Sequence, residues 1–152
     1  MKFTIDRADL LRSLNHVHSV VERRNTIPIL ANVLLQAEGD ALSLTTTDMD
    51  LEIVESTAAK AAQGGATTVP AHTLYDIVRK LPDGSSIELV SGAGDTTLQV
   101  KAGKSTFRLG CLPTEDFPRM GSADKFAYSF KLPAADLRTL IDRTRFAISN
   151  EE

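Results

Sequence analysis

The stretch Ile5-Asp6-Arg7-Ala8-Asp9-Leu10 recurs in similar form as Val69-Pro70-Ala71-His72-Thr73-Leu74 and as Leu132-Pro133-Ala134-Ala135-Asp136-Leu137. The three copies begin at residues 5, 69 and 132, so 64 and then 63 residues separate them. Each copy follows a short extended run and then places Asp at a helix N-cap or Pro at a first helical position. The near-equal spacing predicts an internal repeat in which a strand leads directly into a helix.

Alternating apolar residues follow each of the first two predicted helices and indicate strands. After the first helix these residues are Val33/Leu35, Leu42/Leu44 and Leu51/Ile53; after the second they are Ile87/Leu89, Leu98/Val100 and Phe107/Leu109/Cys111. Gly39-Asp40 and Gly103-Lys104 are turn signals between neighbouring strands. Each repeat is therefore predicted to be one strand, one helix and three strands. The predicted fold class is α+β, with the helices on one face of antiparallel sheet.

The repeats also predict the domain organisation. Residues 1–118 are expected to form one domain of two repeats, at about 1–60 and 65–112. Residues 119–125 are expected to be a linker. Residues 126–152 begin a third copy that stops just after its helix. We therefore expect a fragment that ends in the truncated start of a second domain.

Composition excludes several classes of protein. The 152 residues are 42% hydrophobic and carry a net charge of −3, which argues against a protein that holds nucleic acid by basic charge alone. The single cysteine, Cys111, excludes an internal disulfide framework and a cysteine zinc cluster, and it fits a reducing, cytoplasmic compartment. The apolar runs are too short to cross a membrane. Without a P-loop or a GxGxxG motif, we expect neither a metal nor a cofactor.

Both of the first two predicted helices have an apolar stripe and an opposite polar stripe. The apolar stripes are Leu10, Leu14, Val17 and Val21, and then Leu74, Ile77, Val78 and Leu81. The polar stripes are Arg12, His16, Ser19 and Arg23, and then His72, Asp76 and Arg79 with Lys80 beside them. Such stripes fit ordinary solvated faces, or a basic surface that contacts a polyanion without reading its bases. The residues alone leave both interpretations open.

A catalytic alternative rests on two groups of residues. Cys111 with His72 and Asp76 has the residue types of a nucleophile, a base and an orienting acid. Asp48 and Asp50 are carboxylates of the kind that hold a divalent cation. However, Cys111 continues the apolar alternation of its strand, which favours a small buried side chain, and the two aspartates lack a calcium-loop glycine. A small α+β hydrolase or transferase is thus the second hypothesis.

Five ordered segments carry a more specific pattern: Met1–Ile5, Thr26–Asn32, Leu42–Asp48, Gly65–Ala71 and Leu112–Pro118. Together they resemble the bacterial sliding clamps, the β subunits of DNA polymerase III, over essentially the whole chain. The resemblance implies the DNA-clamp fold and a head-to-tail dimeric ring with three similar domains per subunit. It implies that the helices line the hole around duplex DNA. The implied function is that of a non-catalytic processivity factor, which tethers the replicative polymerase to DNA.

The resemblance implies site residues as well. The expected DNA-binding residues are Arg23, Arg24, His72, Arg79, Lys80, Asn150 and Glu151. Of these, Arg23 and Lys80 come from the helix stripes and not from the resemblance. The chain departs from the family at His72 and Thr73, where basic residues are common. The expected subunit interface is Lys104, Phe107 and Leu109. The resemblance places the binding pocket for polymerase and clamp loader beyond residue 152, and it implies no membrane partner.

Overall fold

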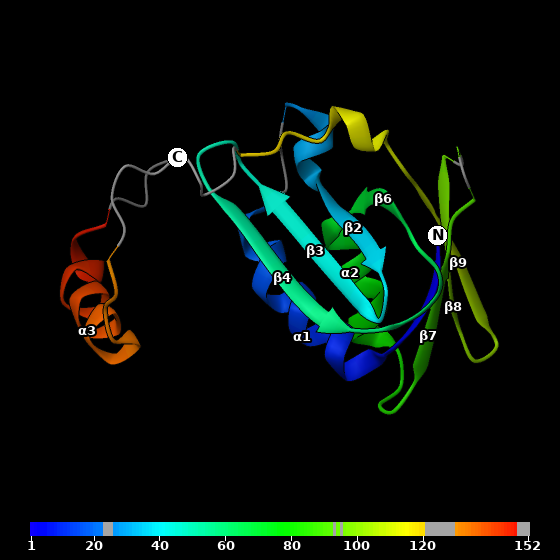
Figure 1. Ribbon diagram of the computed structural model, residues 1–152, viewed down its shortest axis with the longest axis horizontal. Coiled ribbons are helices and arrows are strands. Elements are labelled where there is room, and N and C mark those ends of the chain that lie inside the picture. Colours follow the sequence, from blue (N-terminus) through cyan, green and yellow to red (C-terminus); the bar gives the residue numbers. More distant parts are fainter. Residues whose placement is uncertain (23–25, 93, 95, 121–129, 149–152) are drawn as a thin grey trace. The chain divides into compact units, whose positions relative to one another are not determined.

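A computed structural model of the chain (Figure 1) describes residues 1–22, 26–92, 94, 96–120 and 130–148. The chain divides into two compact units, residues 1–120 and 121–152. Arg119 and Met120, which were expected to open the linker, belong to the first unit. There the guanidinium of Arg119 donates to Gln36 at 3.4 Å, and the amide of Met120 donates to Glu52 at 3.2 Å. The rest of the expected linker lies outside the described residues.

The first unit contains both complete repeats. The first consists of β1 (Lys2–Asp6), α1 (Arg7–Val17), η1 (His18–Val20), η2 (Pro28–Ala31), β2 (Asn32–Glu38), β3 (Ala41–Thr47) and β4 (Glu52–Ala58). A short strand, β5 (Lys60–Gln63), comes between the repeats. The second consists of β6 (Gly65–Pro70), α2 (Ala71–Lys80), β7 (Ser86–Val90), β8 (Thr97–Ala102) and β9 (Ser105–Gly110), followed by η3 (Thr114–Asp116).

The strands form two antiparallel sheets in the orders β5-β1-β7-β8-β9 and β4-β3-β2-β6. The predicted repeat of one strand, one helix and three strands is confirmed, but its first strand does not join its own three strands. Instead β1 pairs with β7 of the second repeat, and β6 pairs with β2 of the first. Each sheet therefore combines both repeats. Strand β5 was not predicted, because Lys60-Ala61-Ala62-Gln63 shows no apolar alternation.

Two of the turns depend on glycine. Gly39 and Gly103 both have φ of +56°, in the left-handed region, and connect β2 to β3 and β8 to β9. A residue with a side chain is strained in that conformation, so both positions favour glycine. The two predicted turns are confirmed.

Helix α1 begins as predicted, because the Asp6 side chain caps it by accepting from the Ala8 amide at 2.8 Å. Pro70 and Pro133 lie one position earlier than predicted, immediately before the first helical residue. The helices pack against the sheets through the predicted apolar stripes, of which Leu10, Leu14, Val17, Leu74 and Val78 are fully buried. Figure 1 shows α1 and α2 together behind the β4-β3-β2-β6 sheet. The main core lies between these helices and both sheets.

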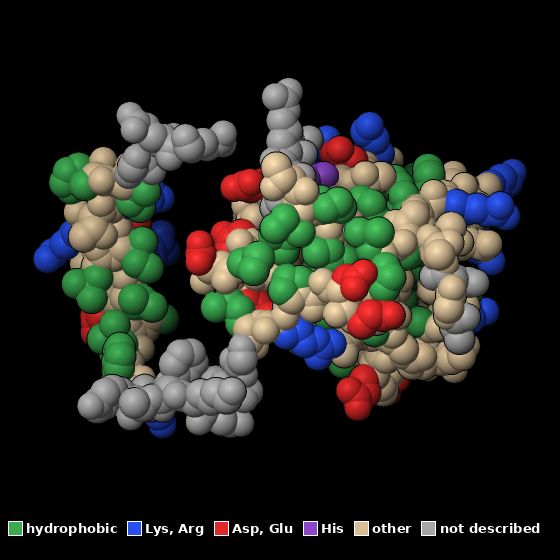
Figure 2. Space-filling view, turned by 90° about the horizontal axis from the view of Figure 1, so that it is seen from above, with side chains coloured by type: hydrophobic (Ala, Val, Ile, Leu, Met, Phe, Trp, Pro, Cys, Tyr) green, Lys and Arg blue, Asp and Glu red, His purple; other side chains and the backbone are tan. Residues whose placement is uncertain are grey.

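A smaller cluster covers the opposite face of the β4-β3-β2-β6 sheet. Leu34 points away from the main core, since side chains alternate along a strand, and it packs with Ile29, Leu30 and Phe117. The segment after β9 is fastened to β6 at Thr68, whose hydroxyl donates to the carbonyl of Leu112 at 2.7 Å. Figure 2 looks onto the side of the first unit that carries η2 and η3. Hydrophobic side chains gather there, with acidic side chains among them.

The second unit contains α3 (Ala134–Thr144) and η5 (Arg145–Ala147). Its apolar stripe, Leu137, Leu140 and Ile141, is about half exposed, and the described residues of that unit do not cover it. No helix in the described part of the chain combines the length and the apolar character needed to cross a bilayer.

Candidate nucleic-acid interface

The exposed face of α1 and α2 is less basic than its arginines suggest. Arg12 forms an ion pair with Asp9 at 3.3 Å, one helical turn away. Arg79 forms the same type of pair with Asp76 at 3.1 Å. Lys80 is exposed and has no carboxylate partner among the described residues. Exposed pairs of this kind contribute about 0–1 kcal/mol, so a phosphate can displace the carboxylate at little cost.

The surface of α2 around Arg79 includes stacked rings. The guanidinium carbon of Arg79 lies 5.5 Å from the ring centre of Tyr75, a cation–π distance. Tyr75 also stacks on His18, at 4.2 Å between ring centres and 12° between planes. His18 and Tyr75 were not predicted as site residues. Their signal in the sequence is weak, because the two residues meet only after α1 and α2 pack together.

His72 has a different environment from the one expected of a DNA contact. Its Nε2 lies 2.7 Å from the carbonyl oxygen of Val21, and the ring is half-buried. Its Nδ1 is buried and has no hydrogen-bond partner among the described residues. His72 therefore contacts backbone, and its role toward DNA stays a prediction.

Four of the predicted DNA-binding residues lie outside the described residues: Arg23, Arg24, Asn150 and Glu151. Val21 and Glu22 come directly before the first two in the sequence, and Val21 is anchored in the main core. Their assignment to DNA binding stays a prediction.

Strand β9, which carries the expected subunit interface, is the last strand of its sheet in the described part of the chain. Lys104 is exposed in the turn before it, and Phe107 is half-buried. Leu109 is only 7% exposed and belongs to the main core, so its side chain packs within the chain itself. A hollow of about 450 Å³ lies beside Phe107, lined by Ile77, Leu81 and Pro82 among others.

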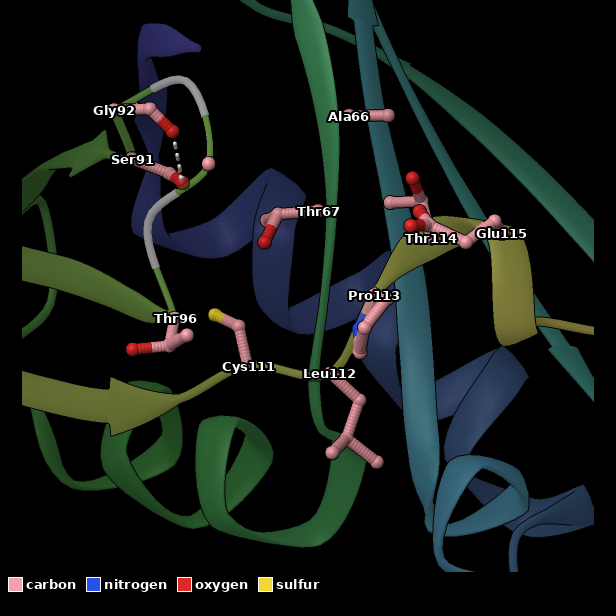
Figure 3. Close-up of a pocket in the computed structure, with 11 residues that line it drawn as sticks. Ala66, Thr67, Ser91, Gly92, Thr96, Cys111, Leu112, Pro113, Thr114 and Glu115 are labelled. Atoms are coloured by element: carbon pink, nitrogen blue, oxygen red, sulfur yellow. Dashed lines mark hydrogen bonds between the residues drawn. The ribbon is translucent and has the colours of Figure 1, made fainter.

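The residues of the catalytic alternative are not brought together around Cys111. Cys111 lies just after β9 and is half-buried, rather than buried within the strand as predicted. It lines a cavity of about 270 Å³ beside Thr67 and Thr96 (Figure 3). Neither His72 nor Asp76 lines this cavity in the described part of the chain.

The Asp48/Asp50 pair forms a tight turn. One carboxylate oxygen of Asp48 accepts from the amides of Asp50 at 2.9 Å and of Leu51 at 2.7 Å. Between them Met49 adopts a φ of 81°, which is unusual for a residue with a side chain. The predicted ordinary acidic turn fits this geometry. The described residues include no group of three or more His, Cys, Asp or Glu side chains placed to hold a metal ion.

Arg7 is an important contact residue that the sequence did not reveal. Its guanidinium donates to the carbonyl of Val78 at 3.1 Å and to that of Arg79 at 2.8 Å, and it also pairs with Asp83. It thereby joins the start of α1 to the end of α2. Nothing local marks it, because its partners lie more than 70 residues away in the sequence.

Comparison with known proteins places this fold in a family. The chain is 54% identical over 152 residues to the "Beta sliding clamp" of Caulobacter vibrioides, covering 100% of this chain and 41% of that protein. It is 44% identical over 153 residues to the "Beta sliding clamp" of Pseudomonas aeruginosa, with the same coverage of each chain. The chain therefore spans about two fifths of the length of these relatives.

Solved structures agree with these sequence matches. The crystal structure of the DNA polymerase sliding clamp from Caulobacter crescentus superposes with a TM-score of 0.92 at 54% identity, covering 100% of this chain and 41% of that one. A sliding clamp from Bartonella birtlesii, crystallised with griselimycin, also gives a TM-score of 0.92 at 49% identity, covering 100% and 40%. The family model of the DNA polymerase III beta subunit, N-terminal domain, matches residues 1–121. This chain belongs to that family.

Proposed function

We propose that this chain is the N-terminal part of a sliding clamp, a ring that encircles duplex DNA and holds the replicative polymerase on it. The single observation that carries the proposal is the structural match over the whole chain to a DNA polymerase sliding clamp, with a TM-score of 0.92. The clamp acts in the cytoplasm, where the bacterial chromosome lies, and catalyses no reaction of its own. Polymerase and clamp loader bind parts of the full-length protein that follow residue 152.

The exposed face of α1 and α2 is the part that we assign to the DNA. Its paired arginines support a weak, sequence-independent contact with phosphates, because Asp9 and Asp76 offset the charge of Arg12 and Arg79. A closed ring keeps its DNA by topology, so it needs no strong electrostatic attraction. Strong attraction to phosphates would slow sliding.

The outer edge of β9 is the part that we assign to the second subunit. An edge strand offers free N–H and C=O groups that can pair with a strand of another chain. Phe107 and the hollow beside it add apolar surface next to that edge. Lys104 is exposed in the turn before β9, directly before Ser105, which lines the hollow.

A topological test separates a ring from an ordinary DNA-binding protein. A full-length clamp carrying this segment is loaded onto nicked circular DNA, and half of the sample is then cut once with a restriction enzyme. A ring stays on the circle and slides off the linear DNA, which gel filtration of the complexes measures. Equal retention on both forms would contradict the proposal, since binding by charge alone does not depend on DNA ends.

A further inference from the structure

His72 is held from two sides in the first turn of α2. Its Nε2 lies 2.7 Å from the carbonyl oxygen of Val21. A carbonyl can only accept, so Nε2 must carry the proton, and in the neutral ring Nδ1 is then the bare acceptor. That Nδ1 is buried, with no hydrogen-bond partner in the described part of the chain. Neither ring nitrogen is therefore available to a phosphate on the surface.

Neighbouring rings hold His72 in this orientation. The ring of His18 meets it edge-on, at 5.7 Å between centres and 84° between planes. His18 is itself fixed, because its Nδ1 lies 2.9 Å from the carbonyl oxygen of Leu14 and its ring stacks on Tyr75. To reach a phosphate, His72 would have to break its bond to Val21 or expose the buried Nδ1.

His72 supplies a hydrogen-bond donor to the carbonyl of Val21. Val21 follows η1 with extended dihedral angles, φ −83° and ψ 111°, and its own amide donates to the carbonyl of His18 at 3.2 Å. The Val21 side chain is 4% exposed, in the main core. Past the end of α1 its carbonyl has no helical partner, and the N-terminal turn of α2 supplies a donor.

We propose that His72 is a positioning residue for the DNA-contacting face. It fixes the backbone of Val21, from which the chain continues to Arg23 and Arg24, and it does not itself touch DNA. This inference rests on the proposed function for its link to DNA, but the contact itself can be tested without DNA.

The first test needs no substitution. Long-range ¹H–¹⁵N spectra of the histidine rings in the 152-residue chain report which nitrogen carries the proton. We expect the Nε2–H tautomer for His72 at neutral pH. A proton on Nδ1 in the neutral ring would overturn the proposal, because Nε2 could then not donate to Val21.

The second test compares His72→Gln with His72→Ala. Glutamine keeps a neutral N–H donor, whereas alanine removes it. We expect the Val21 amide to exchange with solvent about tenfold faster in His72→Ala and close to the wild-type rate in His72→Gln. Equal exchange in His72→Ala and the wild type would overturn the proposal.

The third test uses a full-length clamp carrying this segment, and measures DNA affinity against salt concentration. Loss of a phosphate contact lowers the slope of log K against log salt by about one. We expect His72→Gln to keep the wild-type slope and His72→Ala to lower it, because only His72→Gln keeps the donor that positions Val21. A slope lowered by about one in both variants would make His72 a DNA contact, and a wild-type slope in His72→Ala would show that it positions nothing for DNA; either result would overturn the proposal. If the wild-type clamp fails to stay on circular DNA, the proposed function fails instead, while the tautomer and exchange tests still decide the Val21 contact.

Discussion

The Nε atom of Arg7, in the first turn of α1, lies 3.1 Å from the carbonyl oxygen of Val78 near the end of α2. At the other end of the helix pair, His72 in the first turn of α2 meets the carbonyl of Val21 just past α1. The two helices therefore run antiparallel, and the first turn of each supplies a donor to carbonyls at the end of the other. The Val78 carbonyl also accepts from the Leu81 amide at 3.3 Å, so Arg7 adds a second donor there, while His72 supplies a donor to the Val21 carbonyl past α1. These reciprocal contacts hold the helix pair together.

We expect replacement of Arg7 to destabilise the first unit. The side chain is 13% exposed, and Arg7→Met removes the bonds to Val78 and Arg79 together with the ion pair to Asp83. The expected loss is about 1–3 kcal/mol in the free energy of unfolding, measured by urea titration. Arg12→Met is the matched control, since Arg12 is 67% exposed and its pair contributes little. Equal losses in the free energy of unfolding in Arg7→Met and Arg12→Met would show that the Arg7 contacts stabilise the unit no more than an exposed ion pair does.

Hydrogen bonds from Thr68 are expected to hold the segment that follows β9 against β6. Its hydroxyl accepts from Asn32 at 3.0 Å and from the Leu112 amide at 3.1 Å, and it donates to the Leu112 carbonyl at 2.7 Å. Thr68→Val keeps the shape but leaves these groups without partners, so we expect a loss of about 1–3 kcal/mol. Limited proteolysis should then cut near Leu112 sooner than in the wild type. Thr106→Val, at an exposed position of β9, should change neither measurement.

Local signals in the sequence predicted the local structure. The glycines of the turns, the Asp6 cap and the apolar stripes each depend on neighbours within a few residues, and all appear as expected. The pairing of β1 with β7 did not follow, because strands some 80 residues apart leave no mark of their partner in either sequence. Apolar alternation likewise marks both core and interface strands. The alternation of the strand therefore could not show that Leu109 is buried whereas Phe107 is half-exposed.

Freeing Arg79 from its acidic partner should strengthen contact with DNA. In a full-length clamp, Asp76→Asn removes the carboxylate that lies 3.1 Å from the guanidinium. We expect a steeper dependence of DNA affinity on salt, by up to about one unit in the slope of log K against log salt. The control is Asp40→Asn, which makes the same charge change in the exposed turn between β2 and β3. An equal effect from Asp40→Asn would assign the gain to net charge alone.

Arg24 should contact the DNA backbone and not the bases. Replacing Arg24 with alanine in a full-length clamp is expected to weaken binding equally on duplexes of different sequence. The salt slope should fall by about one, as for the loss of a single phosphate contact. Lys60→Ala, on the exposed strand β5, removes the same charge elsewhere and should have little effect. A loss that depends on DNA sequence would show base recognition and refute the prediction.

Substitutions at Phe107 and Leu109 should have different effects, although the two residues share one face of β9. Phe107 is assigned to the subunit interface, whereas Leu109 lies in the core. Fully burying one such side chain contributes about 1.5–3 kcal/mol, so Phe107→Asp should raise the dimer dissociation constant of a full-length clamp by tenfold or more. Leu109 is 7% exposed in the core, so Leu109→Asp should instead lower the free energy of unfolding by at least about 3 kcal/mol. Sedimentation across a dilution series, read beside circular dichroism, distinguishes these outcomes, and Thr106→Asp on the opposite face is the control. If Phe107→Asp keeps the wild-type dissociation constant, this edge of β9 is not the subunit interface.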